Sequence, residues 1–206
     1  MLYTAGIHAP EWITSLLLIK FAQNLCNAFV SNSQIYGYDA KYLYENCSLY
    51  IIPMINPDGI NLVNNFYSPT SEVYISANNI AKNYPDIPFP SGWKANINGV
   101  DLNSQFPANW ELGKKIKSNL GYNKPAPRDF AGDSPLSEPE SQAMYNFALL
   151  KNFSLCLCFH SQGEVIYWKY TDFLPPNSLE LAKEFAHVSG CLLYTSPSPR
   201  DAHESR

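Results

Sequence analysis

Gly6-Ile7-His8-Ala9-Pro10-Glu11-Trp12 is the stretch around which the rest of the chain can be interpreted. It places a histidine and a glutamate three positions apart, and imidazole and carboxylate are both ligands of Zn²⁺. A catalytic zinc site takes three protein ligands and leaves a fourth position to water, so one short loop cannot complete it. The alternative is a chance His-x-x-Glu at a solvated helix start. A third candidate ligand is His160, far along the chain.

The residues on either side predict that this loop joins a strand to a helix. Residues 2–5 are apolar and strand-like, and apolar residues recur at helical spacing from Trp12 to about Phe29. In open α/β sheets, ligands bind outside the carboxyl ends of the strands. The loop therefore occupies a position where such folds place their sites.

His160 follows a second predicted strand. Residues 153–159 form an apolar run typical of a buried strand, and another strand-like run covers residues 165–170. A lone histidine after an apolar strand is more often structural than a ligand. Because His8 and His160 both follow strands, however, we expect them to converge with Glu11 on one metal ion.

The middle of the chain predicts a further strand and a long loop. Residues 49–55 are typical of a strand buried on both faces, and the Asn56-Pro57-Asp58-Gly59 that follows predicts a tight turn. Residues 64–90 predict a surface loop with one short helix at about residues 72–82.

Residues 93–106 crowd polar amides around a short apolar core. This composition suits a loop that contacts substrate. Alternatively, it is a turn network in which Asp101 and Asn103 bond the local backbone.

A loop rich in proline, glycine and aspartate covers residues 125–137 and leads into a predicted helix that ends at about Leu150. Ser137 is expected to cap this helix, with Glu138 and Glu140 as acids of its first turn.

Length, composition and net charge exclude several classes of protein. The 206 residues suffice for one sizeable α/β domain, and 46% hydrophobic with 16% charged residues is a globular composition. The net charge of −4, without a basic cluster, argues against nucleic acid and against electrostatic membrane attachment. The apolar run 13–19 is too short to span a bilayer, so no membrane is expected. The five unevenly spaced cysteines predict buried free thiols, and the compartment stays open.

Several motifs together resemble the zinc carboxypeptidases of the M14 family. They are His8-x-x-Glu11, Asn56-Pro57-Asp58-Gly59, Gly99-Val100-Asp101-Leu102-Asn103 and His160-Ser161-Gln162-Gly163-Glu164. Four more are typical of the bacterial γ-D-glutamyl-meso-diaminopimelate peptidases: Trp93-Lys94-Ala95-Asn96, Gln105-Phe106-Pro107-Ala108, Pro135-Leu136-Ser137-Glu138-Pro139-Glu140 and Gly163-Glu164-Val165-Ile166-Tyr167-Trp168. The resemblance covers residues 1 to about 190.

The resemblance implies an α/β fold with a mixed, largely parallel sheet between helices, and one Zn²⁺ held by His8, Glu11 and His160. It also implies metal-assisted hydrolysis of peptides, in which the ion polarises the scissile carbonyl and activates water while a separate glutamate transfers the proton. Asn103 matches an asparagine that holds the terminal carboxylate of the substrate. Glu164, by the same resemblance, is structural or faces the substrate.

Two positions depart from the family pattern. Ser104 and Asn98 stand where arginines are common, and an arginine grips a carboxylate with two parallel hydrogen bonds. Lys94 is the nearest basic residue and can serve as a point charge. The substrate-binding candidates are therefore Asn103, Lys94 and Ser104.

The end of the chain is expected to be foreign. Residues 191–201 match, codon by codon, the translation of a transposase adapter used in short-read library preparation, and residues 202–206 fit a barcode and further adapter bases. A Ser/Pro-rich tail would explain the composition but not this match. We expect a partial M14 domain at residues 1–190 and no function for His203 or Glu204. The N-terminus is expected to be incomplete as well.

The resemblance places the general-base glutamate well downstream of the second histidine, so we expect this chain to lack a catalytic residue and to be inactive alone. His187, on a predicted amphipathic helix, is expected to be solvated. The parent is expected to be a zinc metallopeptidase of peptidoglycan stem peptides. The alternatives are an ordinary carboxypeptidase and a non-catalytic peptide- or cell-wall-binding protein.

Overall fold

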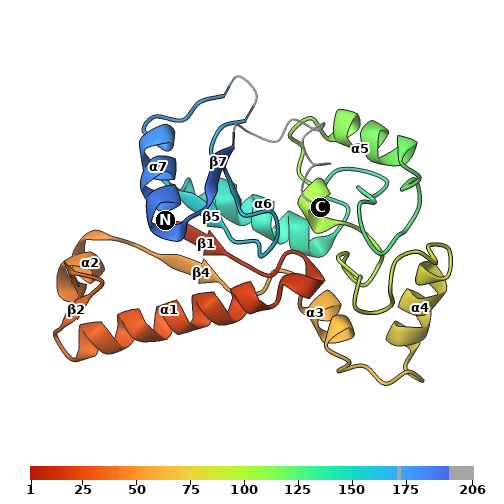
Figure 1. Ribbon diagram of the computed structural model, residues 1–206, viewed down its shortest axis with the longest axis horizontal. Helices are drawn as coiled ribbons and strands as arrows, with labels where there is room; N and C mark the ends of the chain where they lie inside the picture. Colours follow the sequence, from red (N-terminus) through yellow and green to blue (C-terminus); the bar gives the residue numbers. More distant parts are fainter. Residues whose placement is uncertain (171–172, 195–206) are drawn as a thin grey trace. The chain divides into compact units, whose positions relative to one another are not determined.

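A computed structural model describes residues 1–170 and 173–194 of the chain (Figure 1). It divides into two compact units, residues 1–160 and residues 161–206, which are described separately below.

The first unit is built on a three-stranded parallel sheet. Its order is β4 (Tyr50–Ile52), β1 (Leu2–Thr4) and β5 (Cys156–Cys158), so β1 is central. The carboxyl ends of the strands are joined as well, because Ala5 N–H donates to Ile52 O (3.0 Å) and Phe159 N–H donates to Thr4 O (2.8 Å). The chain segments that carry His8 and His160 therefore leave the sheet at the same edge.

Two helices cover opposite faces of this sheet. The ring of Tyr3 lies 5.9 Å from that of Phe21 in α1 (Ile13–Val30), and the ring of Tyr50 lies 5.6 Å from that of Phe147 in α6 (Pro139–Lys151). Tyr50 is in register with Leu2, the neighbour of Tyr3, and successive side chains of a strand point to opposite faces. The α/β architecture with helices flanking a parallel sheet is thereby confirmed.

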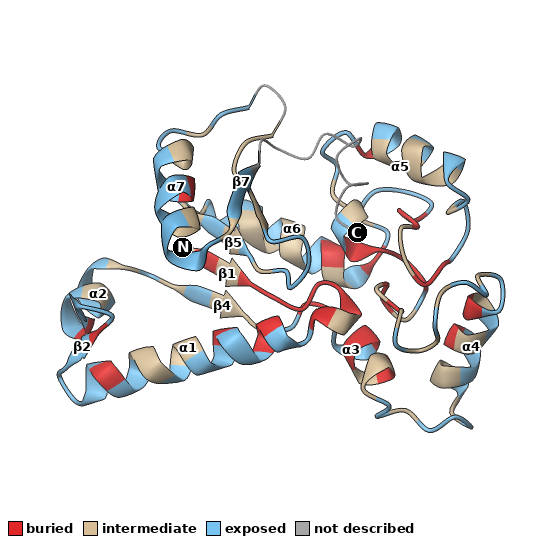
Figure 2. Cartoon of the chain, in the orientation of Figure 1, coloured by how far each residue is buried: buried red, intermediate tan, exposed pale blue. Residues whose placement is uncertain are grey.

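The strands are shorter and more open than predicted. Tyr50 is 37% exposed, and Cys156 and Cys158 of β5 are exposed, so the prediction of burial on both faces was wrong (Figure 2). The prediction of buried thiols was wrong for all five cysteines, because Cys26 is exposed as well and Cys47 and Cys191 are only partly buried. The register places Cys156 on the same face as Tyr50. α6 packs its Phe147 ring on β4, two strands away from β5, which leaves the cysteines of β5 open.

The tight turn predicted at residues 56–59 is instead the start of a helix, α3 (Pro57–Val63). Asn56 caps it by accepting a hydrogen bond from Gly59 N–H (3.0 Å), and Pro57 occupies the first turn, where its missing N–H costs nothing. Ile60 and Leu62 of this helix are both buried. The same residues that favour a turn thus also favour a helix start when buried apolar residues follow.

The short helix predicted in the long loop is confirmed as α4 (Glu72–Ala81). Trp93 is fully buried between this helix and α3, in a cluster that also contains Ala9, Leu62, Ala77, Ala81 and Ala95. The cluster ties residues 93–95 to the loop after β1.

The remaining elements of the first unit are small. They are the short helix η1 (Ala9–Glu11), the strands β2 (Gln34–Ile35) and β3 (Tyr38–Asp39) of an antiparallel pair, α2 (Ala40–Asn46), η2 (Leu102–Ser104) and α5 (Trp110–Asn119). α5 was not anticipated from the sequence. By length and composition, residues 9–30 could also span a membrane, so the helical stretch is longer than the seven-residue run considered above. The absence of a membrane partner stays a prediction.

The second unit contains β6 (Val165–Tyr167), α7 (Ser178–Ser189) and β7 (Leu192–Tyr194), with β6 and β7 parallel. β7 lies within the segment expected to be adapter-derived, and residues 195–206 of that segment lie outside the described residues. The domain boundary at Gly190 stays a prediction.

Candidate metal centre

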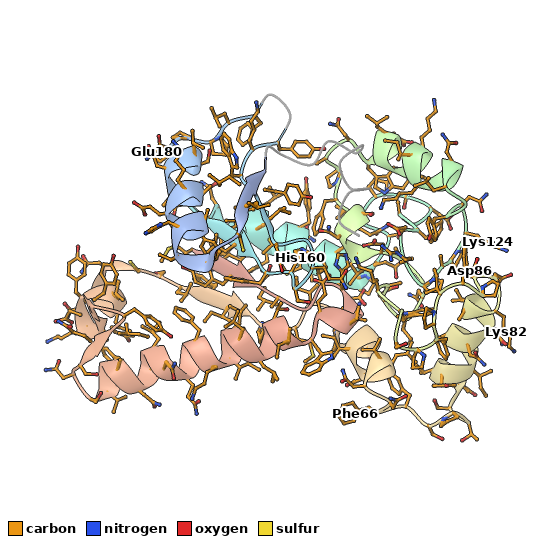
Figure 3. The ribbon with its side chains drawn as sticks, viewed as in Figure 1. Phe66, Lys82, Asp86, Lys124, His160 and Glu180 are labelled. Atoms are coloured by element: carbon orange, nitrogen blue, oxygen red, sulfur yellow. The ribbon has the colours of Figure 1, made fainter. Side chains whose placement is uncertain are left out.

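The structure brings His8, Glu11 and His160 together. Nδ1 of His8 lies 3.0 Å from Oε1 of Glu11, and Nδ1 of His160 lies 2.9 Å from Oε2 of the same carboxylate. One ligand atom from each residue lies within 4.8 Å of the other two. His8 precedes the short helix after β1, and Glu11 is the last residue of that helix. His160, which is labelled in Figure 3, follows β5 by two residues.

Local backbone features fix the loop that carries the first two residues. Gly6 adopts a left-handed conformation (φ 64°), and a Cβ there would lie 2.7 Å from Ser15 Oγ. The hydroxyl of Thr14 accepts from Gly6 N–H (3.2 Å) and donates to Glu11 O (2.7 Å). Buried residues run from β1 into the start of α1 (Figure 2). The first turn of α1, the helix that follows the loop, therefore holds the loop in place through Thr14.

The surroundings of Glu11 favour its ionised form despite its burial. It is 1% exposed, which alone would raise its pKa, but hydrogen bonds from His160 and His8 hold the pKa well below its usual range. An ionised oxygen is what a metal ion requires of a carboxylate ligand.

Asp101 lies behind His8. Its Oδ1 is 3.3 Å from Nε2 of His8, an ion-pair distance without the alignment of a hydrogen bond. Burial alone would lower the pKa of His8, but the charge of Asp101 and the contact with Glu11 raise it to about 9. The pKa of Asp101 is held low, against its own burial, by His8 and by Lys117 and Lys94.

The donor set fits Zn²⁺. Two imidazole nitrogens and one carboxylate oxygen match a catalytic zinc site with an open fourth position. A neutral His8 that carries its proton on Nε2, the nitrogen beside Asp101, would present Nδ1 as the ligand, which is the usual carboxylate–histidine arrangement behind a metal. The side chain of His160 is 28% exposed, against 7% for His8 and 2% for Glu11, so the site is open on the His160 side.

The proposed substrate residues lie on the adjoining segment. Lys94 O accepts from Ala9 N–H (3.2 Å), next to His8, and the charge of Lys94 acts on both His8 and Asp101. Asn103, which is exposed, and Ser104 form η2, and Asp101 Oδ1 accepts from Asn103 N–H (3.1 Å). The turn network is therefore present, and contact with substrate stays a prediction.

Glu138 has a different place from the one predicted. It is 7% exposed, and its Oε2 accepts from Asn96 Nδ2 (2.7 Å) and Asn98 Nδ2 (2.8 Å). Ser137 does not cap α6, because Glu138 occupies the N-cap position and the Ser137 hydroxyl lies within donating distance of Glu138 Oε1 (3.0 Å) and Gln105 Oε1 (3.1 Å). The side chain of Asn98 is thus hydrogen-bonded to the buried carboxylate of Glu138.

The other single residues are placed as follows. Glu140 is an acid of the first turn of α6, as predicted, and burial raises its pKa. His187 is exposed on α7, as predicted. Glu164 belongs to the second unit, where its carbonyl accepts from Leu192 N–H (2.9 Å), and its expected role stays a prediction.

Sequence reasoning missed Asp101 as a partner of His8 and Glu138 as a buried acceptor. The carboxylate of Asp101 could have been suspected from its place in a turn crowded with amides. The partner of Glu138 lies about 40 residues earlier in the chain, and no local pattern reports such a contact.

The chain is similar to known proteins over nearly all of its length. A family model described as "Zinc carboxypeptidase" matches residues 1–200. The protein "Gamma-D-glutamyl-L-diamino acid endopeptidase 1" of Lysinibacillus sphaericus is 43% identical over 91% of this chain and 46% of its own length. The human "Mast cell carboxypeptidase A" is 28% identical over 86% of this chain and 37% of its own length.

Solved structures share the fold. A carboxypeptidase A from Helicoverpa armigera aligns with a TM-score of 0.61 at 22% identity, over 95% of this chain and 44% of that one. The murein-tripeptide amidase MpaA from Escherichia coli O157 aligns with a TM-score of 0.52 at 21% identity, over 96% and 63% respectively. The chain thus spans about half the length of the curated bacterial relative it matches.

Proposed function

The chain belongs to the zinc carboxypeptidase family, and from this premise we propose that its parent protein is a zinc-dependent peptidase of peptidoglycan stem peptides. The observation that carries the proposal is the convergence of His8, Glu11 and His160. The substrate class rests on the 43% identity to a protein named for cleavage at a γ-D-glutamyl-diamino acid bond. The proposed cut is that bond, near a free carboxyl end, rather than removal of any C-terminal residue.

In this proposal His8, Glu11 and His160 hold one Zn²⁺. When bound, the ion supplies a Lewis acid that polarises a carbonyl and lowers the pKa of a coordinated water. Asp101, which lies 3.3 Å from Nε2 of His8, would favour the tautomer of His8 that offers Nδ1 as the ligand atom. Lys94 offers a positive charge beside the site, and the Asn103 amide and Ser104 hydroxyl offer hydrogen bonds to substrate oxygens.

We further propose that residues 1–206 alone bind zinc without efficient hydrolysis. Among the described residues, the carboxylates that contact the histidine rings are Glu11 and Asp101. The first is needed as a ligand, and the second faces the nitrogen of His8 that points away from the ligand cluster. Neither is placed as a separate proton acceptor for an attacking water.

The test uses the full-length parent and two substrates, a γ-D-glutamyl-meso-diaminopimelate peptide and a linear peptide with an ordinary C-terminal residue. Mass spectrometry of the products should show release of the diaminopimelate-containing fragment, and His160→Ala should abolish it. Release of the C-terminal residue instead would make the parent an ordinary carboxypeptidase. If the parent binds one zinc ion but releases neither product, it is a non-catalytic binding protein.

A further inference from the structure

Asp129 connects the surface helix α5 to the residues behind the candidate metal centre. Its backbone N–H donates to Oδ2 of Asp101 (3.3 Å), and Asp101 N–H donates back to Phe130 O (2.8 Å). The other carboxylate oxygen of Asp101 is the one that faces His8. The segment around Asp129 therefore holds both the backbone and the side chain of Asp101.

Asp129 adopts a conformation that a side chain disfavours. Its φ is 65°, in the left-handed region, which aspartate tolerates better than most residues but does not prefer. This conformation aims its N–H at Asp101, so it must be stabilised by other contacts.

Two cations provide those contacts. Lys117 Nζ binds Oδ1 of Asp129, and Arg128 Nε donates to Oδ2 (2.7 Å). The side chains of Lys117 and Asp129 are only 12% and 14% exposed, so this pair is poorly screened by solvent. The charge of Lys117 also reaches Asp101, whose pKa it helps to lower.

We propose that Lys117 and Asp129 are positioning residues for the metal centre, acting on His8 through Asp101. Lys117 neutralises Asp129 and keeps its left-handed backbone in place, which holds the N–H on Asp101. Asp101 in turn fixes the ring of His8. Without Lys117, the carboxylate of Asp129 keeps only the contact with Arg128 of these two, and the N–H donor of residue 129 can turn away.

The inference rests on the proposed zinc site, and zinc affinity is its readout. We would measure the dissociation constant of the 206-residue chain by competition with a chelator, counting only the affinity that His8→Ala removes. Lys117→Met should weaken zinc binding by about tenfold, the lower end of the effect of losing an outer partner of a ligand. Lys117→Arg should restore most of the affinity, because it keeps the charge.

Lys115→Met is the matched control. Lys115 is exposed on the same helix, so its loss should leave zinc affinity unchanged. If Lys117→Met fails to fold, Asp129→Asn takes its place. Asparagine tolerates the left-handed backbone but removes the charge that Lys117 and Arg128 bind, and it should weaken zinc binding to a similar extent.

A double-mutant cycle separates positioning from general stability. If the effect passes through Asp101, Lys117→Met should have no further effect on zinc affinity in an Asp101→Asn background. Independent, additive losses would overturn the inference, as would wild-type affinity in both Lys117→Met and Asp129→Asn. If the wild-type chain has no zinc site that depends on His8, the proposed function fails as well, so the two failures are distinguishable.

Discussion

The charge of His8 is governed by the two carboxylates beside it, those of Asp101 and Glu11. Burial would lower the pKa of His8, but Asp101 and Glu11 stabilise its charged form and raise the pKa to about 9. A zinc ligand must be a neutral imidazole, so the proton and the metal ion compete for His8. The carboxylates that favour the proton are also those that would favour the ion.

This competition predicts a pH dependence of zinc binding. Because the folded-state pKa is raised, the charged form persists up to about pH 9, and zinc must displace that proton below this pH. The affinity should therefore rise by about tenfold per pH unit from pH 7 to 8.5 and level off near pH 9. Chelator competition at several pH values measures it. An affinity that is constant over this range would contradict the raised pKa.

Replacing two helical glycines by alanine should change the free energy of unfolding in opposite directions. A Cβ on Gly59 in α3 would lie 2.6 Å from the Asn56 amide and 2.7 Å from Ala95 O, whereas a Cβ on Gly113 in α5 meets nothing within 4 Å. Gly59→Ala should lower the free energy of unfolding by about 1–3 kcal/mol through overpacking and loss of the Asn56 cap.

Gly113→Ala is the control and should raise the free energy of unfolding by about 0.5–1 kcal/mol, because alanine favours the helix interior. Urea unfolding monitored by circular dichroism measures both. Equal effects of the two substitutions would show that the packing around Asn56 is not as described.

The elements also show what the sequence could predict. The helix after Glu11 and the strand before His160 followed from periodicity, because each lies in a strongly patterned segment, whereas the sheet between helices was implied by the family resemblance. Residues 56–59 were misread because proline and glycine after a polar cap suit both a turn and a helix start. α5 was not predicted because it has few apolar residues and lies in a polar stretch. The contact through which we propose that it supports the metal centre joins Lys117 to Asp129, twelve residues further along the chain.

The sequence was sufficient to predict the three candidate metal ligands, but not the residues that contact and position them. His8, Glu11 and His160 stood out because both histidines follow strands, and the sheet order then brings them to one edge. The contacts from Asp101 to His8 and from Asn96 to Glu138 join residues roughly 90 and 40 positions apart. Such contacts depend on the path of the irregular segments, which periodicity does not describe.

At the scale of the whole molecule, α1 exposes a large apolar surface. Ile13, Leu16 and Leu17 are 51%, 53% and 54% exposed, and they lie next to one another on the helix. Contiguous apolar patches of this kind favour association. We therefore expect residues 1–206 to self-associate as concentration rises.

Leu16→Lys with Leu17→Lys should reduce that association. Because both side chains are half exposed, the free energy of unfolding should change by less than about 1 kcal/mol. Sedimentation velocity over a range of concentrations measures the association. A wild-type chain that stays monomeric at every concentration would contradict this prediction.

The central claim is that His8, Glu11 and His160 together hold one zinc ion. Zinc K-edge X-ray absorption on the 206-residue chain loaded with one equivalent of zinc tests it most directly. We predict nitrogen and oxygen ligands at about 2.0–2.1 Å, with two imidazoles and no sulfur. The five free cysteines offer the competing ligands, and a zinc–sulfur distance of about 2.3 Å would contradict the claim.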